Sequence, residues 1–281
     1  PPLDVTTGAA STATLTIGGV AHVALVRPSD ALFQAQIAAV LSHAALRTER
    51  SAEILTQIDG QGPFWAALLP ARLALLPYLQ EVLTAVVQLT VFVEMRFKHL
   101  FACPRPLDWS PQVQPMITTP GHGAFPMGHA VQIFAVAHVL KALVRDAIAS
   151  APAGTALSAD WLQQVDRLAW RVSENRIVAG VHFPVDLWGG IKLGVALGRH
   201  AASRLRGQAT PALPDVFTSA VDEGLADLSG MVGPPLATVM ESINADLLVA
   251  APRLSGPAAF GADLAAECWS RALDELRRVL P

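Results

Sequence analysis

Three short segments of the sequence gather cationic and imidazole side chains that could bind an anion. They are residues 98–106 (KHLFACPRP), residues 125–129 (FPMGH) and residues 175–186 (NRIVAGVHFPVD). Each segment is marked by Gly or Pro and lies near an expected helix end. Folded together, they would supply three fixed cations, two imidazoles and a helix N-terminus. That set suits a phosphate-shaped oxyanion in a partly dry pocket, and it would repel a metal cation.

The cations expected at this site are Lys98, Arg105 and Arg176, and their roles would be complementary. An arginine offers planar, forked donors to two oxygens, whereas a lysine ammonium is a point charge for one oxygen. The backbone N–H of Gly128 could approach an anion closely because glycine has no Cβ. Lysine is scarce in this chain, so Lys98 stands out within a set of functional residue types.

Two histidines, His129 and His182, can divide the remaining work. One would attack or coordinate the central atom of the anion, and the other would exchange protons with an apical oxygen. Asp186 follows His182 by one helical turn and could orient that ring or stabilise its charge. Either histidine alone is as readily a buried structural side chain, so the assignment depends on the combination of segments.

In residue identity and spacing these segments resemble the type 2 phosphatidic acid phosphatase superfamily, which includes bacterial acid phosphatases and the vanadium-dependent haloperoxidases. The superfamily pattern has three parts: Lys, six residues, Arg-Pro; then Pro-Ser-Gly-His; then Arg, five residues, His, three residues, Asp. The resemblance covers about residues 60–205. The matching residues are Lys98, Arg105, Pro106, Pro126, Gly128, His129, Arg176, His182 and Asp186.

Two positions depart from the superfamily pattern. Met127 replaces a serine whose hydroxyl normally gives a hydrogen bond to the anion. The substitution should weaken oxyanion binding, or leave room for a water or an apolar substrate. Asn175 replaces the serine that usually precedes the arginine. We therefore expect lowered activity.

The resemblance implies a division of roles within the site. His182 would be the covalent ligand of vanadate or, in a phosphatase, the nucleophile that forms a phosphohistidine. His129 would be the acid–base group, and Lys98 would polarise a bound peroxide or phosphoryl oxygen. The two guanidinium groups and the Gly128 N–H would neutralise equatorial oxygens.

His122 is the main basis for choosing between the two branches of the superfamily. It lies seven residues before His129, in Pro120-Gly121-His122-Gly123, and brominating and iodinating haloperoxidases typically carry a second histidine at that offset. Residues 64–70 (FWAALLP) also resemble soluble bacterial haloperoxidase-type members. The chain is shorter than most haloperoxidases, which favours a phosphatase, and an exposed histidine is common in a Gly-Pro-rich loop.

We therefore predict a vanadium-dependent haloperoxidase that oxidises bromide or iodide with hydrogen peroxide and serves a small organic acceptor. The cofactor would be vanadate, held by His182, and phosphate is close enough in shape to occupy the same site. The first alternative is an acid phosphatase that hydrolyses phosphomonoesters, with His182 as nucleophile and His129 as general acid. The second is an anion-binding protein that has lost turnover through Met127. A homodimer is expected from related haloperoxidases.

Helix caps, helix breakers and the lack of alternating strands beyond residue 30 predict a mainly α-helical fold, a helical bundle with the oxyanion pocket at helix ends. The 281 residues are 52% hydrophobic and 15% charged, which allows a large buried core. We expect an extended N-terminal arm (1–30), a helical catalytic domain (31–206) and a helical C-terminal extension of the same domain (207–281). The net charge of −3 argues against nucleic acid as a partner.

The expected helices place the site residues at helix ends. Ser29 should cap the first helix and Ser51 the second. A long helix should carry Lys98, and a proline-rich connector should carry Arg105. The ranges expected are 30–47, 51–58, 78–100, 128–148, 159–176 and 184–205, with further helices near 235–249 and 260–280.

No apolar run is expected to span a bilayer, because the longest candidate, residues 73–97, is interrupted by charged and amide side chains such as Glu81, Glu94 and Arg96. We therefore expect a soluble protein, either cytoplasmic or exported after removal of a signal segment. Cys103 and Cys268 match no metal-ligand spacing and support neither a zinc site nor a disulfide framework.

Overall fold

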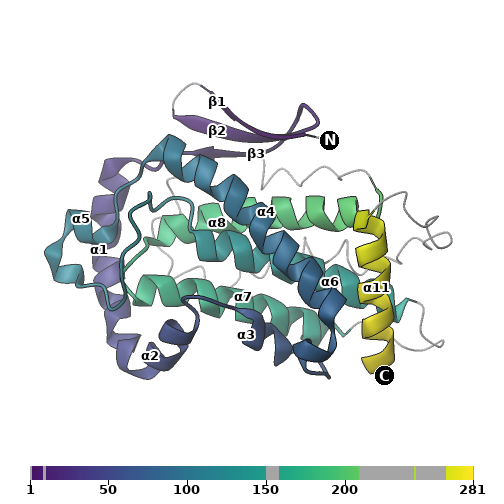
Figure 1. Ribbon diagram of the computed structural model, residues 1–281. Helices are drawn as coiled ribbons and strands as arrows, with labels where there is room; N and C mark the ends of the chain where they lie inside the picture. The colour runs from purple at the N-terminus through teal and green to yellow at the C-terminus, as the bar shows by residue number, and fades with distance from the viewer. Residues whose placement is uncertain (1, 9–10, 150–157, 209–243, 245–263, 281) are drawn as a thin grey trace.

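Helices make up most of the part of the protein that the structure describes, and a small sheet covers one side of them (Figure 1). The computed structural model describes residues 2–8, 11–149, 158–208, 244 and 264–280. The predicted mainly α-helical class is confirmed. The helices are α1 (Asp30–His43), α2 (Arg47–Thr56), α3 (Gly62–Ala66), α4 (Pro77–Phe101), α5 (Pro106–Trp109), α6 (Gly128–Ile148), α7 (Ala159–Val178), α8 (Pro184–Leu205) and α11 (Leu264–Val279), with short 3₁₀ turns at Ala44–Leu46, Leu73–Leu75 and Pro111–Val113.

The sequence signals at helix ends account for most of these boundaries. Ser29 caps α1 by accepting the Leu32 N–H at 3.2 Å, as predicted. Pro184 occupies the first turn of α8, where its missing N–H costs nothing. Ser51 was expected to start a helix, and that prediction was wrong: α2 begins at Arg47 and Ser51 lies inside it. A 3₁₀ turn leads from α1 directly into α2, so no separate cap is needed.

Helices α6 and α8 form the centre of the core because glycines let them approach closely. All of α8 from Pro184 to Ser203 is buried. A Cβ placed on Gly190 would lie 2.6 Å from Ala130 Cβ and 2.7 Å from the Met127 carbonyl oxygen, so the two backbones are nearly in contact there. This contact holds the first turn of α6 against the first turns of α8.

Replacing Gly190 by alanine should lower the free energy of unfolding by about 1–3 kcal/mol, because the added methyl group overlaps α6. Chemical denaturation would measure the change. Gly60→Ala is the matched control, since a Cβ on Gly60 meets no atom within 4 Å. If the Gly190 variant and the native protein have the same free energy of unfolding, α6 and α8 can move apart at this contact without loss of stability.

The N-terminal segment differs from the expected extended arm. It forms an antiparallel sheet in the order β1 (Leu3–Thr7), β2 (Thr12–Ile17) and β3 (Val20–Val26). Buried and half-buried residues alternate along β2, and Gly18-Gly19 has the positive φ angles that a tight hairpin turn requires. The sheet lies beside α4 and α8 (Figure 1) and adds Leu15 and Leu25 to the core.

The C-terminal helix α11 agrees with the helix expected near 260–280. It packs against α4, α6 and α8, and its buried Glu275 accepts hydrogen bonds from the Tyr78 and Leu79 N–H groups at the start of α4. A carboxylate at this position favours the start of α4 because it meets unpaired N–H groups. The helix expected near 235–249 lies outside the described residues, apart from Asn244, which is helical.

One helical stretch of the described residues, Pro77–Trp109, is long and apolar enough to cross a membrane by length and composition alone. Its mean hydropathy is 1.2, and 39% of its apolar window is buried. Glu94 and Lys98 on this stretch are buried. A single stretch of this kind is weak evidence for a membrane span, since the core helix of a folded protein passes the same test. The expectation that the protein has no membrane span stays a prediction.

Candidate active site

The end of α4, the start of α6, the end of α7 and the start of α8 carry the predicted site residues. Backbone contacts join these ends: the Met127 N–H donates to the Asp186 carbonyl oxygen at 2.8 Å and links α6 to α8. Through-space electrostatic interactions link His182 to both predicted cations of the 98–105 segment and to His129. The predicted residues that the structure brings together are Lys98, Arg105, His122, Gly128, His129, Arg176, His182 and Asp186.

His182 is held by an acceptor on one ring nitrogen and a donor on the other. Its Nδ1 lies 2.9 Å from Asp186 Oδ2, and its Nε2 lies 2.9 Å from an Arg105 guanidinium nitrogen. A guanidinium only donates, so Nε2 accepts and Nδ1 carries the hydrogen. Burial and the nearby positive charges lower the pKa of His182. The ring is therefore neutral, and its Nε2 lone pair accepts the Arg105 hydrogen bond; a bond from Nε2 to phosphorus or vanadium would require Arg105 to donate to the anion instead.

Asp186 has a second task at the start of α8. Its Oδ2 also accepts the N–H of Phe183, the N-cap residue of α8, at 2.9 Å. Burial raises the pKa of Asp186 to about 7, while the Phe183 N–H and the charges of Arg105 and Lys98 oppose that rise. The same carboxyl group thus fixes both the helix start and the orientation of the His182 ring.

His122 and Arg105 are in direct contact. The guanidinium donates to the His122 carbonyl oxygen at 3.1 Å, and a guanidinium nitrogen lies 3.2 Å from His122 Nδ1. Arg105 also donates to the Val181 carbonyl oxygen at 2.8 Å. Burial lowers the pKa of the half-buried His122 ring. The loop that carries His122 therefore wraps around a predicted anion-binding cation and is not a detached surface loop.

Lys98 lies in the last turn of α4 and is 1% exposed. Its Nζ donates to the carbonyl oxygens of Gly123, Ala124 and Pro126 at 3.2, 3.2 and 2.6 Å. Burial and the charge of Arg105 lower the pKa of Lys98 to about 8. Lys98 therefore holds the connector that leads to the start of α6 and places a positive charge inside the site.

Arg176 offers the clearest opening for an anion. One of its terminal nitrogens donates to the Ile54 carbonyl oxygen at 3.0 Å and to Gln57 Oε1 at 3.2 Å. Its Nε and its other terminal nitrogen are buried and make no hydrogen bond with the described residues. Burial lowers the pKa of Arg176 to about 10, so it stays charged at neutral pH. Buried donors without acceptors are costly, and an oxyanion would satisfy them.

His129 occupies the first turn of α6, as predicted, and its Nε2 lies 3.0 Å from the Gln57 carbonyl oxygen. The carbonyl only accepts, so Nε2 carries the hydrogen. Burial, the charge of Arg176 and other nearby cations lower the pKa of His129 to about 4. The ring is neutral at pH 7, and a bound dianion would raise its pKa by reversing the local field.

Sequence reasoning missed two residues of the site, Glu94 and Gln57. Glu94 accepts a hydrogen bond from Gln132 at 3.2 Å and packs against Gly128. Its spacing of one helical turn from Lys98 was the signal available. Gln57 lies far from the other site residues in sequence, and no pattern marked it.

The two departures from the superfamily pattern have different surroundings. Met127 is fully buried in the core at the N-cap position of α6 and makes no side-chain cap. Asn175 donates to Glu53 Oε2 and to Gln57 Oε1, each at 2.9 Å, and so ties α7 to α2 and the following loop. Asn175 therefore supports the loop that contacts His129, whereas Met127 contributes packing.

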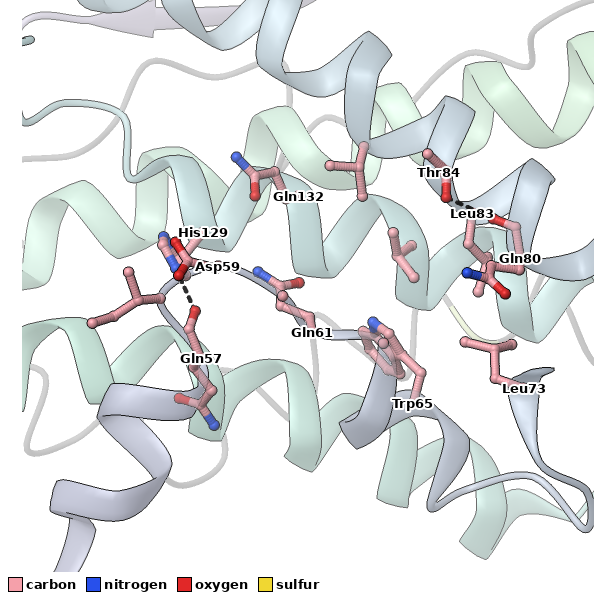
Figure 2. Close-up of a pocket in the computed structure, with 15 residues that line it drawn as sticks. Gln57, Asp59, Gln61, Trp65, Leu73, Gln80, Leu83, Thr84, His129 and Gln132 are labelled. Carbon is pink, nitrogen blue, oxygen red and sulfur yellow. Dashed lines mark hydrogen bonds between the residues drawn. The ribbon is translucent and has the colours of Figure 1, made fainter.

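A cavity of about 240 Å³ opens beside His129, between the loop of residues 57–62 and helices α4 and α6 (Figure 2). His129 and Gln57 lie toward one end and Leu73 and Gln80 toward the other. Apolar side chains and neutral amides dominate its lining, and Asp59 is its one formally charged residue among those described. Its main lining residues besides these are Gln61, Trp65, Leu83, Val87, Gln132 and Val136.

A mainly helical body with imidazoles and cations at converging helix ends is typical of an enzyme that handles an oxyanion. Residues 78–206, from the start of α4 to the end of α8, match the model of the PAP2 superfamily. This superfamily includes vanadium haloperoxidases and type 2 phosphatidic acid phosphatases, and the match supports an activity of that general type. The predicted resemblance is confirmed. A comparison with curated proteins found no match.

Proposed function

We propose that the protein is a vanadium-dependent haloperoxidase that oxidises bromide or iodide with hydrogen peroxide. The observation that carries this choice is the contact of His122 with Arg105, 3.2 Å between the ring Nδ1 and a guanidinium nitrogen. A histidine seven residues before His129 is the feature that separated the two branches in the sequence, and here it adjoins an anion-binding cation. A phosphatase has no need of it.

The residues present fit vanadate or phosphate. The open donors of buried Arg176 need an acceptor, and Arg105 could turn its hydrogen bond from His182 Nε2 to the anion, which would free the Nε2 lone pair. Together with Lys98 and the Gly128 N–H they would hold the anion. Bound vanadate would supply a Lewis-acid centre that activates hydrogen peroxide without a change of oxidation state. A small organic acceptor would lie in the cavity beside His129.

The protein's own groups would then orient and move protons. Asp186 would keep hydrogen on His182 Nδ1, so that Nε2 stays a ligand atom. His129 Nδ1 would accept and return a proton at an oxygen of the bound anion, because its Nε2 is committed to the Gln57 carbonyl. His122 would hold Arg105 in place by accepting from its guanidinium, and Lys98 would add a positive charge beside the anion.

The cavity favours a second candidate, a phosphomonoesterase, because it lies beside the residue that would protonate a leaving group. His182 Nε2 would form a bond to phosphorus while the ester oxygen leaves with a proton from His129. Water would then attack the phosphohistidine and give its proton to His129, which frees phosphate and restores Nε2. Neutral lining residues would suit an uncharged organic group on the phosphate.

The deciding experiment uses phosphate-free protein, with and without orthovanadate, assayed for peroxide-dependent bromination and iodination and for phosphate-ester hydrolysis. Halogenation that requires vanadate would support the haloperoxidase. Ester hydrolysis inhibited by vanadate would mean a phosphatase. His122→Ala should lower halide oxidation by about 10- to 100-fold and leave ester hydrolysis nearly unchanged, because only the first reaction uses this imidazole.

His99→Ala is the matched control for this variant, because His99 is exposed at the end of α4 and lies outside the predicted site. Its halide oxidation should equal that of the native protein. If His122→Ala also oxidises halide at the native rate, His122 is an ordinary loop residue and the choice of haloperoxidase loses its support.

A further inference from the structure

Glu94 places a carboxyl group inside a site built for an anion. It lies on α4, one turn before Lys98, and is 4% exposed. Its Oε1 accepts a hydrogen bond from Gln132 at 3.2 Å, and its Oε2 is buried without a hydrogen-bond partner among the described residues. An unpartnered carboxyl oxygen in such a place requires a physical explanation.

The position of this carboxyl group relative to the start of α6 is well defined. A Cβ placed on Gly128 would lie 2.6 Å from Glu94 Oε1 and 3.1 Å from its Cδ, so the carboxyl group rests against the glycine backbone. Gly128 is the first residue of α6, where N–H groups face outward and favour negative charge. An ionised carboxylate there would compete with an oxyanion and repel it.

We propose that Glu94 is a further oxyanion-binding residue: its protonated carboxyl group donates a hydrogen bond to the bound oxyanion and supplies the donor that Met127 lacks. This inference rests on the proposed oxyanion site. The anion and the proton on Glu94 then bind together, since each stabilises the other. The site accepts an oxyanion most readily in the pH range in which Glu94 is neutral.

The electrostatic surroundings agree with this role. Burial raises the pKa of Glu94 to about 7, although the charge of Lys98 and the hydrogen bond from Gln132 act to lower it. A bound anion would raise that pKa further. Other titratable groups near the site would also take up protons when an anion binds: Lys98 on α4, His129 on α6 and Asp186 on α8. Arg105 adds a fixed positive charge. The proton taken up by Glu94 must therefore be isolated by mutation.

The competing interpretation is that Glu94 is ionised and only balances the charge of Lys98. The two roles differ in what Glu94→Gln does. Glutamine is neutral at every pH and keeps an N–H donor at nearly the same place. If Glu94 is a protonated donor, the variant and the native protein bind an anion with equal affinity at low pH. At high pH the variant then binds the anion more tightly than the native protein does. If Glu94 is a fixed negative charge, the variant binds more tightly at both.

Titration calorimetry with inorganic phosphate at pH 6 and pH 8, in two buffers of different ionisation heat, measures affinity and proton uptake together. The native protein and Glu94→Gln should bind alike at pH 6, and the variant should bind about tenfold more tightly at pH 8. At pH 8 the native protein should take up about one more proton per phosphate than the variant. Protonation changes of phosphate itself are the same with both proteins, so they cancel when the two proton uptakes are compared.

Glu81→Gln on the exposed side of α4 is the control and should match the native protein in both measurements. Glu94→Asp has a shorter side chain, which moves the carboxyl donor away from the anion, so this variant should bind phosphate about tenfold more weakly than the native protein at pH 6. It keeps the inference testable if Glu94→Gln does not fold. Equal affinities of native and Glu94→Gln at both values of pH, or tighter binding by the variant at both, would overturn the role of Glu94 alone. Failure of the native protein to bind phosphate or vanadate would overturn the oxyanion site itself.

Discussion

Replacing His182 by alanine should lower the turnover number by a factor on the order of 10³ or more, whichever of the two proposed reactions the protein performs. The ring is held between a fixed acceptor, Asp186, and a fixed donor, Arg105, each 2.9 Å away. Alanine removes the atom that would bond to vanadium or phosphorus. Neighbouring cations would still bind an anion, so phosphate affinity should fall much less than turnover. Steady-state kinetics and phosphate titration would measure both.

His200→Ala is the matched control, because His200 is also a buried imidazole on α8 but lies outside the predicted site. Both variants lose a buried ring, so thermal unfolding should show similar destabilisation in the two. Native turnover in His182→Ala would remove the basis of the site assignment. Equal loss of turnover in both variants would indicate a general effect on folding.

The helices that carry the site could be predicted closely because their ends are marked by local chemistry. Helix α6 runs over the predicted range, and α8 begins at Pro184 and ends at Leu205, as expected. Proline and glycine act on the backbone conformation of their own residues, so these signals survive whatever the tertiary structure does. The signal at Ser51 failed because a hydroxyl cap works only where the preceding chain is not already helical, and a 3₁₀ turn precedes α2.

The identities of the site residues were readable from spacing, but their partners were not. Arg105 and His182 meet across a separation of 77 residues, and only the folded chain sets that contact. Glu94 illustrates the difference further. Its place one turn from Lys98 was visible in the sequence, whereas its approach to Gly128 depends on how α4 packs against α6. Contacts of this kind follow from tertiary packing, and no local pattern encodes them.

Replacing Asp186 by asparagine should lower turnover by about 10- to 100-fold, because the side chain keeps its size and an acceptor oxygen but loses its negative charge. Asp186 Oδ2 accepts from His182 Nδ1 and from the Phe183 N–H. An asparagine oxygen placed where Oδ2 lies can accept both hydrogen bonds, and the amide N–H₂ then takes the place of Oδ1, which has no partner among the described residues. Hydrogen therefore stays on Nδ1, but the ring loses the nearby negative charge that would stabilise it when Nε2 bonds to phosphorus or vanadium. Turnover and thermal unfolding should be measured together.

Asp186→Ala separates control of the tautomer from simple loss of charge. Alanine removes the acceptor as well as the charge, so hydrogen is no longer held on His182 Nδ1, whereas asparagine keeps an acceptor there. We therefore expect Asp186→Asn to turn over faster than Asp186→Ala and to be the more stable protein, because it also keeps the acceptor for the Phe183 N–H. Near-native turnover in Asp186→Ala would mean that Asp186 serves only as a helix cap and that Arg105 alone sets the orientation of His182.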